Sequence, residues 1–253
     1  MRKILALSRI TFLQGVRSRV FYTLLFFAGL LVLSTVVLNQ MTVGDPTKII
    51  QDLGLATLSL FSLLIILFIG AQIIGKDMET RSIYLILSKP INRAQYLLGR
   101  FLGLLSLLYA NMAAFSIIIL FILFLYSHTV KWSLLLSVGL TAMEMAILLA
   151  FLLFFFTFMT PTIAPFLVLS VFVIGHTTTE VKAIFAQKEG FYHLFSMALY
   201  YVFPNFDILS IQTEVVHNVP IPARHFIYGI GYGLALIILI LILTHLVFRR
   251  KDF

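Results

Sequence analysis

The sequence predicts an all-α polytopic membrane protein with six transmembrane helices. Of its 253 residues, 61% are hydrophobic and 11% are charged, and the mean hydropathy is +1.06. This composition excludes a soluble globular domain. Most of the apolar runs reach the ~20 residues that a helix needs to cross ~30 Å of hydrocarbon. A helix is required because backbone polar groups find no water inside a bilayer.

The expected spans are joined by short connections except at two places. They comprise residues 20–38, 53–74, 101–126, 132–159, 162–179 and 226–248. A basic segment, 1–19, precedes the first span, and its apolar residues share one broad helical face. That pattern is typical of an interfacial helix at headgroup level. The alternative is an anchor whose long basic side chains only snorkel beside the first span.

The basic residues are distributed unevenly along this topology. With the N-terminus inside, the cytoplasmic segments carry 13 Lys and Arg residues and the outer segments carry 5. The positive-inside rule therefore predicts a multi-pass protein of the plasma (inner) membrane with both termini in the cytoplasm. The formal net charge of +8 is then a topology signal with some attraction to anionic lipids of the bilayer. No nucleic-acid partner is expected, because no basic soluble domain carries the charge.

Residues 76–100 form the longest charged stretch and lie between the second and third spans. A short helix is expected over 81–87, and Pro90 should end it because the residue before a proline is disfavoured in the α region. Asn92 and Gln95 have the spacing of a capping box, which predicts that a second helix begins there. Two helices joined by a tight break at a membrane surface are typical of a docking element.

This stretch resembles a known family. Residues 79–103, ETRSIYLILSKPINRAQYLLGRFLG, are similar to the first cytoplasmic loop of ABC-2-type permeases, which typically reads ExRTIYxxLSKPxSRxxxxLGKxLG. The departures are small, since Asn92 stands where Ser is common and Arg100 stands for Lys. Residues 16–21 and the turn at 204–207 also resemble family features. The sequence of the loop is similar to that of the short permeases of nitrous-oxide-reductase maturation.

The resemblance implies a single transmembrane permease domain of the ABC-2, type V exporter-like fold. It implies a dimer, with itself or with a second permease, and a separate ATPase subunit that binds ATP and Mg. Coupling to that ATPase would involve Glu79, Arg81, Tyr84, Pro90 and Arg93. No cofactor is expected in this chain, and no enzymatic activity, because it contains no phosphate-binding loop, zinc-protease motif or nucleophile elbow. The substrate is not specified, and export is expected.

The other long connection is the external segment 180–225. Its apolar part, 191–203, would make a helix of roughly 20 Å, which is too short to cross the membrane. We expect a re-entrant or interfacial helix on the outer side, followed by a turn at Pro204 and Asn205. A seventh span and an unstructured loop are the alternatives.

Glu144 is the acidic residue that lies deep in an apolar run. A charge there costs roughly 2.5–3.5 kcal/mol on insertion scales, so the side chain should face protein or a water-filled cavity, or be protonated. Glu144 is the candidate residue of a substrate path or gate. The alternative is a structural interhelical hydrogen bond, for which Asn111 is a candidate partner.

Two other functional classes stay open. ATP-driven motion in a membrane scaffold would act on an external protein without carrying a substrate, and the segment 180–225 is compatible with that. A haem or quinone redox subunit would need facing imidazoles, for which His176 and His225 are candidates, although the six histidines include no close pair. The absence of cysteine excludes disulfides and thiolate metal sites.

Overall fold

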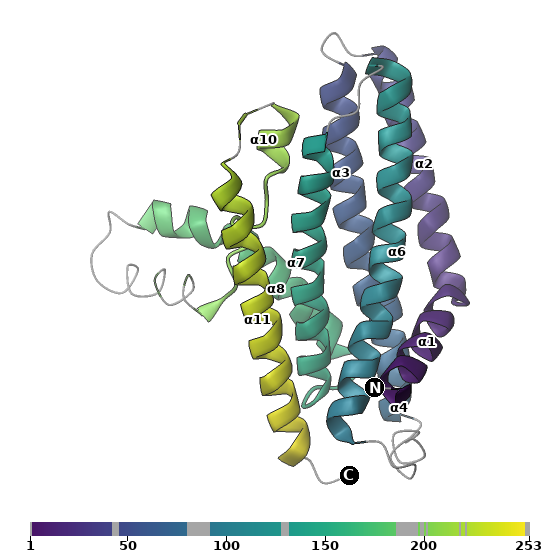
Figure 1. Ribbon diagram of the computed structural model, residues 1–253, viewed down its shortest axis with the longest axis vertical. Helices are drawn as coiled ribbons and strands as arrows, with labels where there is room; N and C mark the ends of the chain where they lie inside the picture. Colours follow the sequence, from purple (N-terminus) through teal and green to yellow (C-terminus); the bar gives the residue numbers. More distant parts are fainter. Residues whose placement is uncertain are drawn as a thin grey trace.

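A computed structural model of the chain is a bundle of long helices (Figure 1). The structure describes residues 2–41, 46–79, 92–127, 132–185, 197, 200, 202–217, 219–220 and 222–250, and no strand occurs among them. Helices α2, α3, α6, α7 and α11 run side by side along the long axis, and the two ends of the chain lie at the same end of the bundle (Figure 1). We call this end the base.

The bounds of the helices follow the apolar runs of the sequence. In chain order they are α1 Arg2–Val16, α2 Arg19–Met41, α3 Pro46–Leu64, the π-helical turn η1 Ile65–Gly70, α4 Ala71–Glu79, α6 Arg93–Ser127, α7 Trp132–Phe156, α8 Ile163–Phe185, α10 Gln212–Val216 and α11 Ala223–Arg250.

Five of these helical segments in the described residues are long and apolar enough to cross a membrane: Thr47–Asp77, Arg93–Ser127, Trp132–Phe156, Ile163–Phe185 and Ala223–Arg249. A sixth results if α1 and α2, which meet at an angle of 60°, are counted as one broken span. The chain is therefore an all-helical, multi-pass type of protein with five to six candidate spans.

The helices are longer than the apolar runs that predicted them. The second expected span, 53–74, lies within Thr47–Asp77, and the third, 101–126, lies within a helix that begins at Arg93. The helix that contains the third span therefore begins before residue 101, and the charged residues at this end, such as Arg93 and Arg100, pair inside the protein and do not terminate it. The expected break between the fourth and fifth spans occurs after Phe156, and the next helix begins at Ile163.

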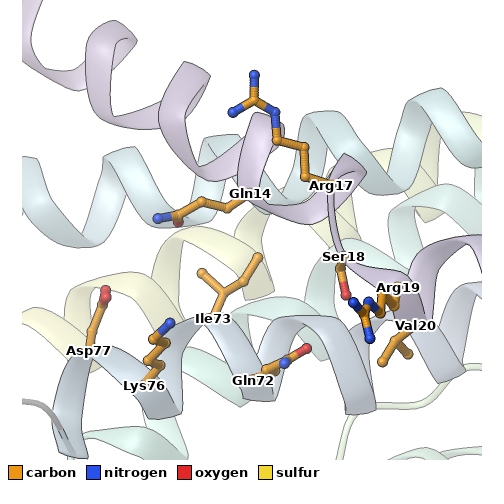
Figure 2. Close-up of a pocket in the computed structure, with 9 residues that line it drawn as sticks. All are labelled: Gln14, Arg17, Ser18, Arg19, Val20, Gln72, Ile73, Lys76 and Asp77. Carbon is orange, nitrogen blue, oxygen red and sulfur yellow. The ribbon is translucent and has the colours of Figure 1, made fainter.

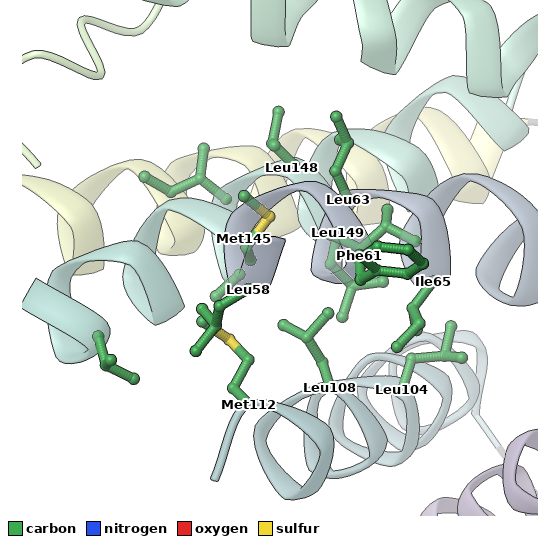
Figure 3. Close-up of a cluster of buried hydrophobic side chains, with 14 of the residues drawn as sticks. Leu58, Phe61, Leu63, Ile65, Leu104, Leu108, Met112, Met145, Leu148 and Leu149 are labelled. Atoms are coloured by element: carbon green, nitrogen blue, oxygen red, sulfur yellow. The ribbon is translucent and has the colours of Figure 1, made fainter. Parts of the chain in front are cut away.

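The core of the bundle is apolar and lies among α3, η1, α6 and α7. Figure 3 shows Leu58 and Phe61 of α3, Leu104 and Leu108 of α6, and Met145 of α7 converging there. All of these side chains are buried. The π-helical turn η1 lies within the span that contributes α3, and a Cβ atom added at Gly70 would lie 2.8 Å from Leu152 of α7. A wider turn of this kind is accommodated by close contact with the neighbouring helix.

Helix α1 packs closely against the base of α6 through two glycines. A Cβ atom at Gly103 would lie 2.5 Å from Cβ of Thr11 and 2.7 Å from the backbone oxygen of Ser8. At Gly99 it would lie 2.7 Å from a methyl group of Leu7. Gly99 and Gly103 are one helical turn apart, which is the small-residue spacing that lets two helices approach within backbone contact in membranes.

Gly103→Ala is therefore expected to destabilise the protein by about 1–3 kcal/mol, because the backbone oxygen of Ser8 cannot move out of the way of the added methyl group. Gly139→Ala on α7 is the matched control, since no atom lies within 4 Å of its Cβ position. Alanine there should be neutral or stabilising by up to ~1 kcal/mol. Thermal unfolding in detergent measures both, and equal effects of the two substitutions would contradict the close packing of α1.

Candidate functional site

A buried polar cluster joins three helices at the base of the bundle. Arg100 of α6 forms a salt bridge with Asp77 of α4, with 2.5 Å between nitrogen and oxygen. The same guanidinium donates to the Thr11 hydroxyl and the Gln14 side-chain oxygen of α1, each at 2.9 Å. The Tyr96 hydroxyl donates to Asp77 at 2.7 Å. We call these five residues the base cluster.

The base cluster is shielded from solvent except at Gln14, which is exposed. The side chains of Arg100 and Asp77 are 3% and 11% exposed. A buried charge pair of this kind is stable only if further hydrogen bonds satisfy its remaining donors and acceptors. Tyr96 and Thr11 supply such bonds, so the ion pair fixes α4, α6 and α1 relative to one another.

Arg93, at the start of α6, connects the base to the last helix. Its guanidinium donates to the backbone oxygens of Phe248 and Arg249 at 2.8 and 3.0 Å. Tyr96 stacks on Phe248, with ring centroids 6.2 Å apart. Carbonyl groups at a helix C-terminus lack intrahelical donors, and a cation is favourable there. Arg93 therefore caps α11 and attaches its end to α6.

The residues predicted to couple to an ATPase lie at this base where the structure describes them. Glu79 is the last residue of α4 and Arg93 is the first of α6. Arg81, Tyr84 and Pro90, with the short helix expected over 81–87, lie outside the described residues. The predicted helix start is confirmed, since the Asn92 N–H donates to the Gln95 side-chain oxygen at 3.2 Å, one half of a capping box.

Glu144 is buried, as its position predicted, with 2% of the residue exposed. Its Oε1 lies 3.5 Å from Nε2 of His176 on α8. The side-chain amide of Asn111, the candidate partner, makes no hydrogen bond to any described residue. The expectation of an Asn111 contact is therefore not met, because Asn111 lies on α6 and Glu144 faces α8.

The ring of His176 is oriented by a contact within its own helix. Nδ1 of His176 lies 3.1 Å from the backbone oxygen of Phe172, an arrangement in which Nδ1 carries the hydrogen. Nε2 faces the buried Oε1 of Glu144 at 3.5 Å without a hydrogen bond between them, so the contact is a close polar approach between α7 and α8.

Glu144 is one of three polar residues on the same face of α7. Ser137, Thr141 and Glu144 have the i, i+4, i+7 spacing of one helical face, and all three are at least 98% buried. The Ser137 hydroxyl has no hydrogen-bond partner among the described residues. A buried stripe of this kind in a span is unusual because each polar group must be desolvated.

The predicted turn at Pro204 and Asn205 is present and holds two spans together. The Asn205 side-chain oxygen accepts from the Asp207 N–H at 3.0 Å, which is an Asx turn. The Asn205 N–H donates to the Tyr232 hydroxyl of α11 at 2.8 Å, and its amide donates to Thr179 of α8 at 3.2 Å. The preceding apolar segment, 191–203, lies mostly outside the described residues.

Gly175 makes the approach of this turn to α8 possible. A Cβ atom there would lie 2.9 Å from the backbone oxygen of Pro204 and would collide with the ring of the buried Phe206. The Phe206 N–H also donates to the Gly175 oxygen at 3.2 Å. The turn therefore lies directly on α8, one helical position from His176.

Sequence reasoning missed the base cluster and the polar stripe of α7. The stripe was visible as the spacing of Ser137, Thr141 and Glu144. The close packing of α1 was visible as the GxxxG motif of Gly99 and Gly103. The pairing of Asp77 with Arg100 had no sequence signal, because both residues were assigned to a loop.

The comparisons with known proteins identify no family for this chain. No protein-family model matches the sequence, and no curated protein matches it. The described residues define a helical membrane protein whose base is held by a buried ion pair.

Proposed function

We propose that the chain is the membrane-spanning permease subunit of an ATP-binding-cassette transporter of the ABC-2 type. A separate ATPase subunit would bind at its base, and the working unit would be a dimer with a second copy or with a second permease. ATP hydrolysis in the partner would drive export of a substrate. The protein would lie in the plasma (inner) membrane with both termini in the cytoplasm.

The proposal is supported by the way in which the helices on either side of segment 80–91 are attached to the rest of the bundle. The two helices that flank it, α4 and α6, are joined by the salt bridge of Asp77 and Arg100. Arg100 also bonds to α1, and Arg93 bonds to the end of α11. A force applied to the segment would therefore reach four helices at once. A coupling loop needs this mechanical property. The sequence of residues 79–103 also resembles that of the coupling loop of ABC-2-type permeases.

The proposed mechanism is alternating access. Closure of two ATPase subunits on ATP would move segment 80–91, with Glu79 and Arg81 setting the register of docking and Tyr84 providing an apolar anchor. Pro90 would fix the turn, and Arg93 would pass the movement to α11. The base cluster would carry it into α4, α6 and α1 as one body.

Glu144 is proposed to lie beside the substrate path. Its contact with His176 joins α7 to α8, and the turn at Asn205 joins α8 to α11. A change in the angle between α7 and α8 would therefore alter the distance between these two side chains. A purely structural role of the same contact is the alternative, and the glutamine variant described in the Discussion separates the two.

Single cysteines test the proposed orientation, since the parent chain contains none. Cysteines at Ser8 and Asp252 should resist an impermeant thiol reagent in intact cells, and one at the exposed Thr213 should react. The physical reason is the excess of basic residues at the base. Permeabilised cells provide the control for reactivity, and labelling of position 252 in intact cells would contradict the topology.

The function itself is tested with the complex purified from native membranes. A co-purifying ATPase whose activity is stimulated by a candidate substrate supports transport. Stimulation only by an external protein would favour the scaffold alternative. An absorption band of bound haem in the purified protein, with no ATPase present, would replace both with a redox subunit.

A further inference from the structure

A polar pocket lies where α1, α2 and α4 meet at the base (Figure 2). Its volume is about 420 Å³, which is within the range of small-molecule sites. Gln14 contributes to one wall from α1, and Gln72 contributes to the opposite wall from α4 (Figure 2). The pocket shares Gln14 and Asp77 with the base cluster and is also lined by the residues of the bend of 60° between α1 and α2.

The pocket carries an excess of positive charge. Arg17 in the bend, Arg19 at the start of α2 and Lys76 of α4 all line it. Among the described residues that line it, the acidic one is Asp77, whose carboxylate already binds Arg100 and Tyr96. The pocket therefore favours an anion. Arginine forks are suited to phosphate, because they donate two parallel hydrogen bonds.

The backbone adds to this charge. Helix α2 begins at Arg19, and Ser18, Arg19 and Val20 border the pocket. The first N–H groups of a helix have no intrahelical acceptor, and the helix dipole places partial positive charge there. The start of α2 and the side chains of Arg19 and Lys76 thus border the same space, whereas the guanidinium of the exposed Arg17 points away from them at its rim (Figure 2).

The surroundings of the pocket favour an anion that has an apolar tail. The pocket lies at the end of the candidate span Thr47–Asp77, which is where headgroups would meet the protein. The surface of α2 that follows Val20 exposes large apolar side chains, with Tyr22 at 58% and Phe26 at 65% exposure. Acyl chains could lie along this surface while a headgroup occupies the pocket, whereas a free phosphate would make no use of it.

We propose that this pocket binds the phosphate headgroup of an anionic phospholipid. Bound there, the lipid would connect the bend, α2 and α4, and would stabilise the angle between α1 and α2. Basic pockets between helices at the cytoplasmic side are suited to such headgroups. The inference stands without the transport proposal, although it uses the proposed orientation, which places the pocket at the cytoplasmic side.

The test is a titration of the full-length protein in neutral detergent with dioleoyl phosphatidylglycerol, followed by native mass spectrometry. The double variant Arg17→Gln with Arg19→Gln should lower the apparent affinity by about tenfold or more, because it removes the charge-assisted donor Arg19 and the positive charge of Arg17 at the rim. Gln72→Glu, which approaches the pocket from the other helix, should weaken binding by repulsion. Arg17→Lys with Arg19→Lys keeps the charge and should retain most of the binding.

The matched control removes the same charge from α1 outside the pocket. Arg2→Gln with Arg9→Gln should change the affinity by about twofold or less, since both side chains are exposed. Equal losses in the control and pocket variants, or equal binding of phosphatidylcholine, would overturn the proposal in favour of non-specific attraction. Displacement of the lipid by low concentrations of inorganic phosphate would overturn the lipid assignment in favour of a soluble anion.

Discussion

Arg100→Met is expected to lower the stability of the protein by about 3–5 kcal/mol. The substitution leaves the Asp77 carboxylate buried without its cation, and it leaves Thr11 and Gln14 without their shared donor. Breaking a buried ion pair by removing one partner is costly because the remaining charge is not hydrated. Thermal unfolding in detergent, followed by loss of the monodisperse gel-filtration peak, measures the effect.

Replacing both partners should be less harmful than the single substitutions suggest. The double variant Asp77→Asn with Arg100→Met contains no buried charge at this position, so the two effects should be strongly non-additive. Arg9→Met, which removes an exposed arginine of α1, is the control and should stay within ~0.5 kcal/mol of the parent. A loss for Arg100→Met no greater than that of the control would contradict the base cluster.

The second large effect concerns the contact of Glu144 with His176. His176→Leu is expected to destabilise the protein by about 1–3 kcal/mol, because it leaves the buried Glu144 carboxyl without its nearest polar partner. Glu144→Leu should cost less, because the side chain it leaves behind, His176, is 33% exposed. The double leucine variant should cost less than the sum of the two, since one interaction is lost in both. Strict additivity would show that the two side chains do not interact.

Glu144→Gln separates a structural role from one in transport. The amide keeps the shape and the hydrogen-bonding capacity of the carboxyl group, so folding should be retained to within about 1 kcal/mol. If the Glu144 carboxyl group takes part in transport, substrate-stimulated ATPase activity should fall while assembly is unchanged. Activity equal to that of the parent would assign Glu144 to the structural alternative.

The sequence predicted the spans because length and hydropathy alone decide whether a helix crosses a bilayer. It predicted the turn at Asn205 and the helix start at Asn92 because both depend on local hydrogen bonds between near neighbours. It also predicted that Glu144 is buried. These features need no knowledge of which helices are neighbours.

The lateral arrangement of the helices could not be predicted in the same way. Inside a span almost every residue is apolar, so hydropathy does not mark the face that meets another helix. The contact of Glu144 with His176 depends on α7 lying beside α8, and the salt bridge of Asp77 with Arg100 depends on α4 and α6 continuing as helices into a charged region. Such contacts are decided by packing rather than by local sequence.

We propose that an ATPase docks on segment 80–91. A charge reversal in this region tests that proposal most directly. Glu79→Lys with Arg81→Glu keeps the net charge of the chain but exchanges the two signs at the proposed docking point. A single exposed pair contributes ~1 kcal/mol or less, so the double reversal is the sharper probe of specific pairing. Arg224→Glu changes an exposed residue at the start of α11, the end of that helix away from Arg93, and is the control for reversed charge.

The measurement is the amount of nucleotide-binding subunit that co-purifies with each tagged variant from native membranes. We expect the parent and Arg224→Glu to retain the ATPase, and the double reversal to lose most of it while inserting into the membrane normally. Retention of the ATPase by the double reversal at the level of the parent, or the absence of any ATPase with the parent, would contradict the assignment of this chain as a permease subunit.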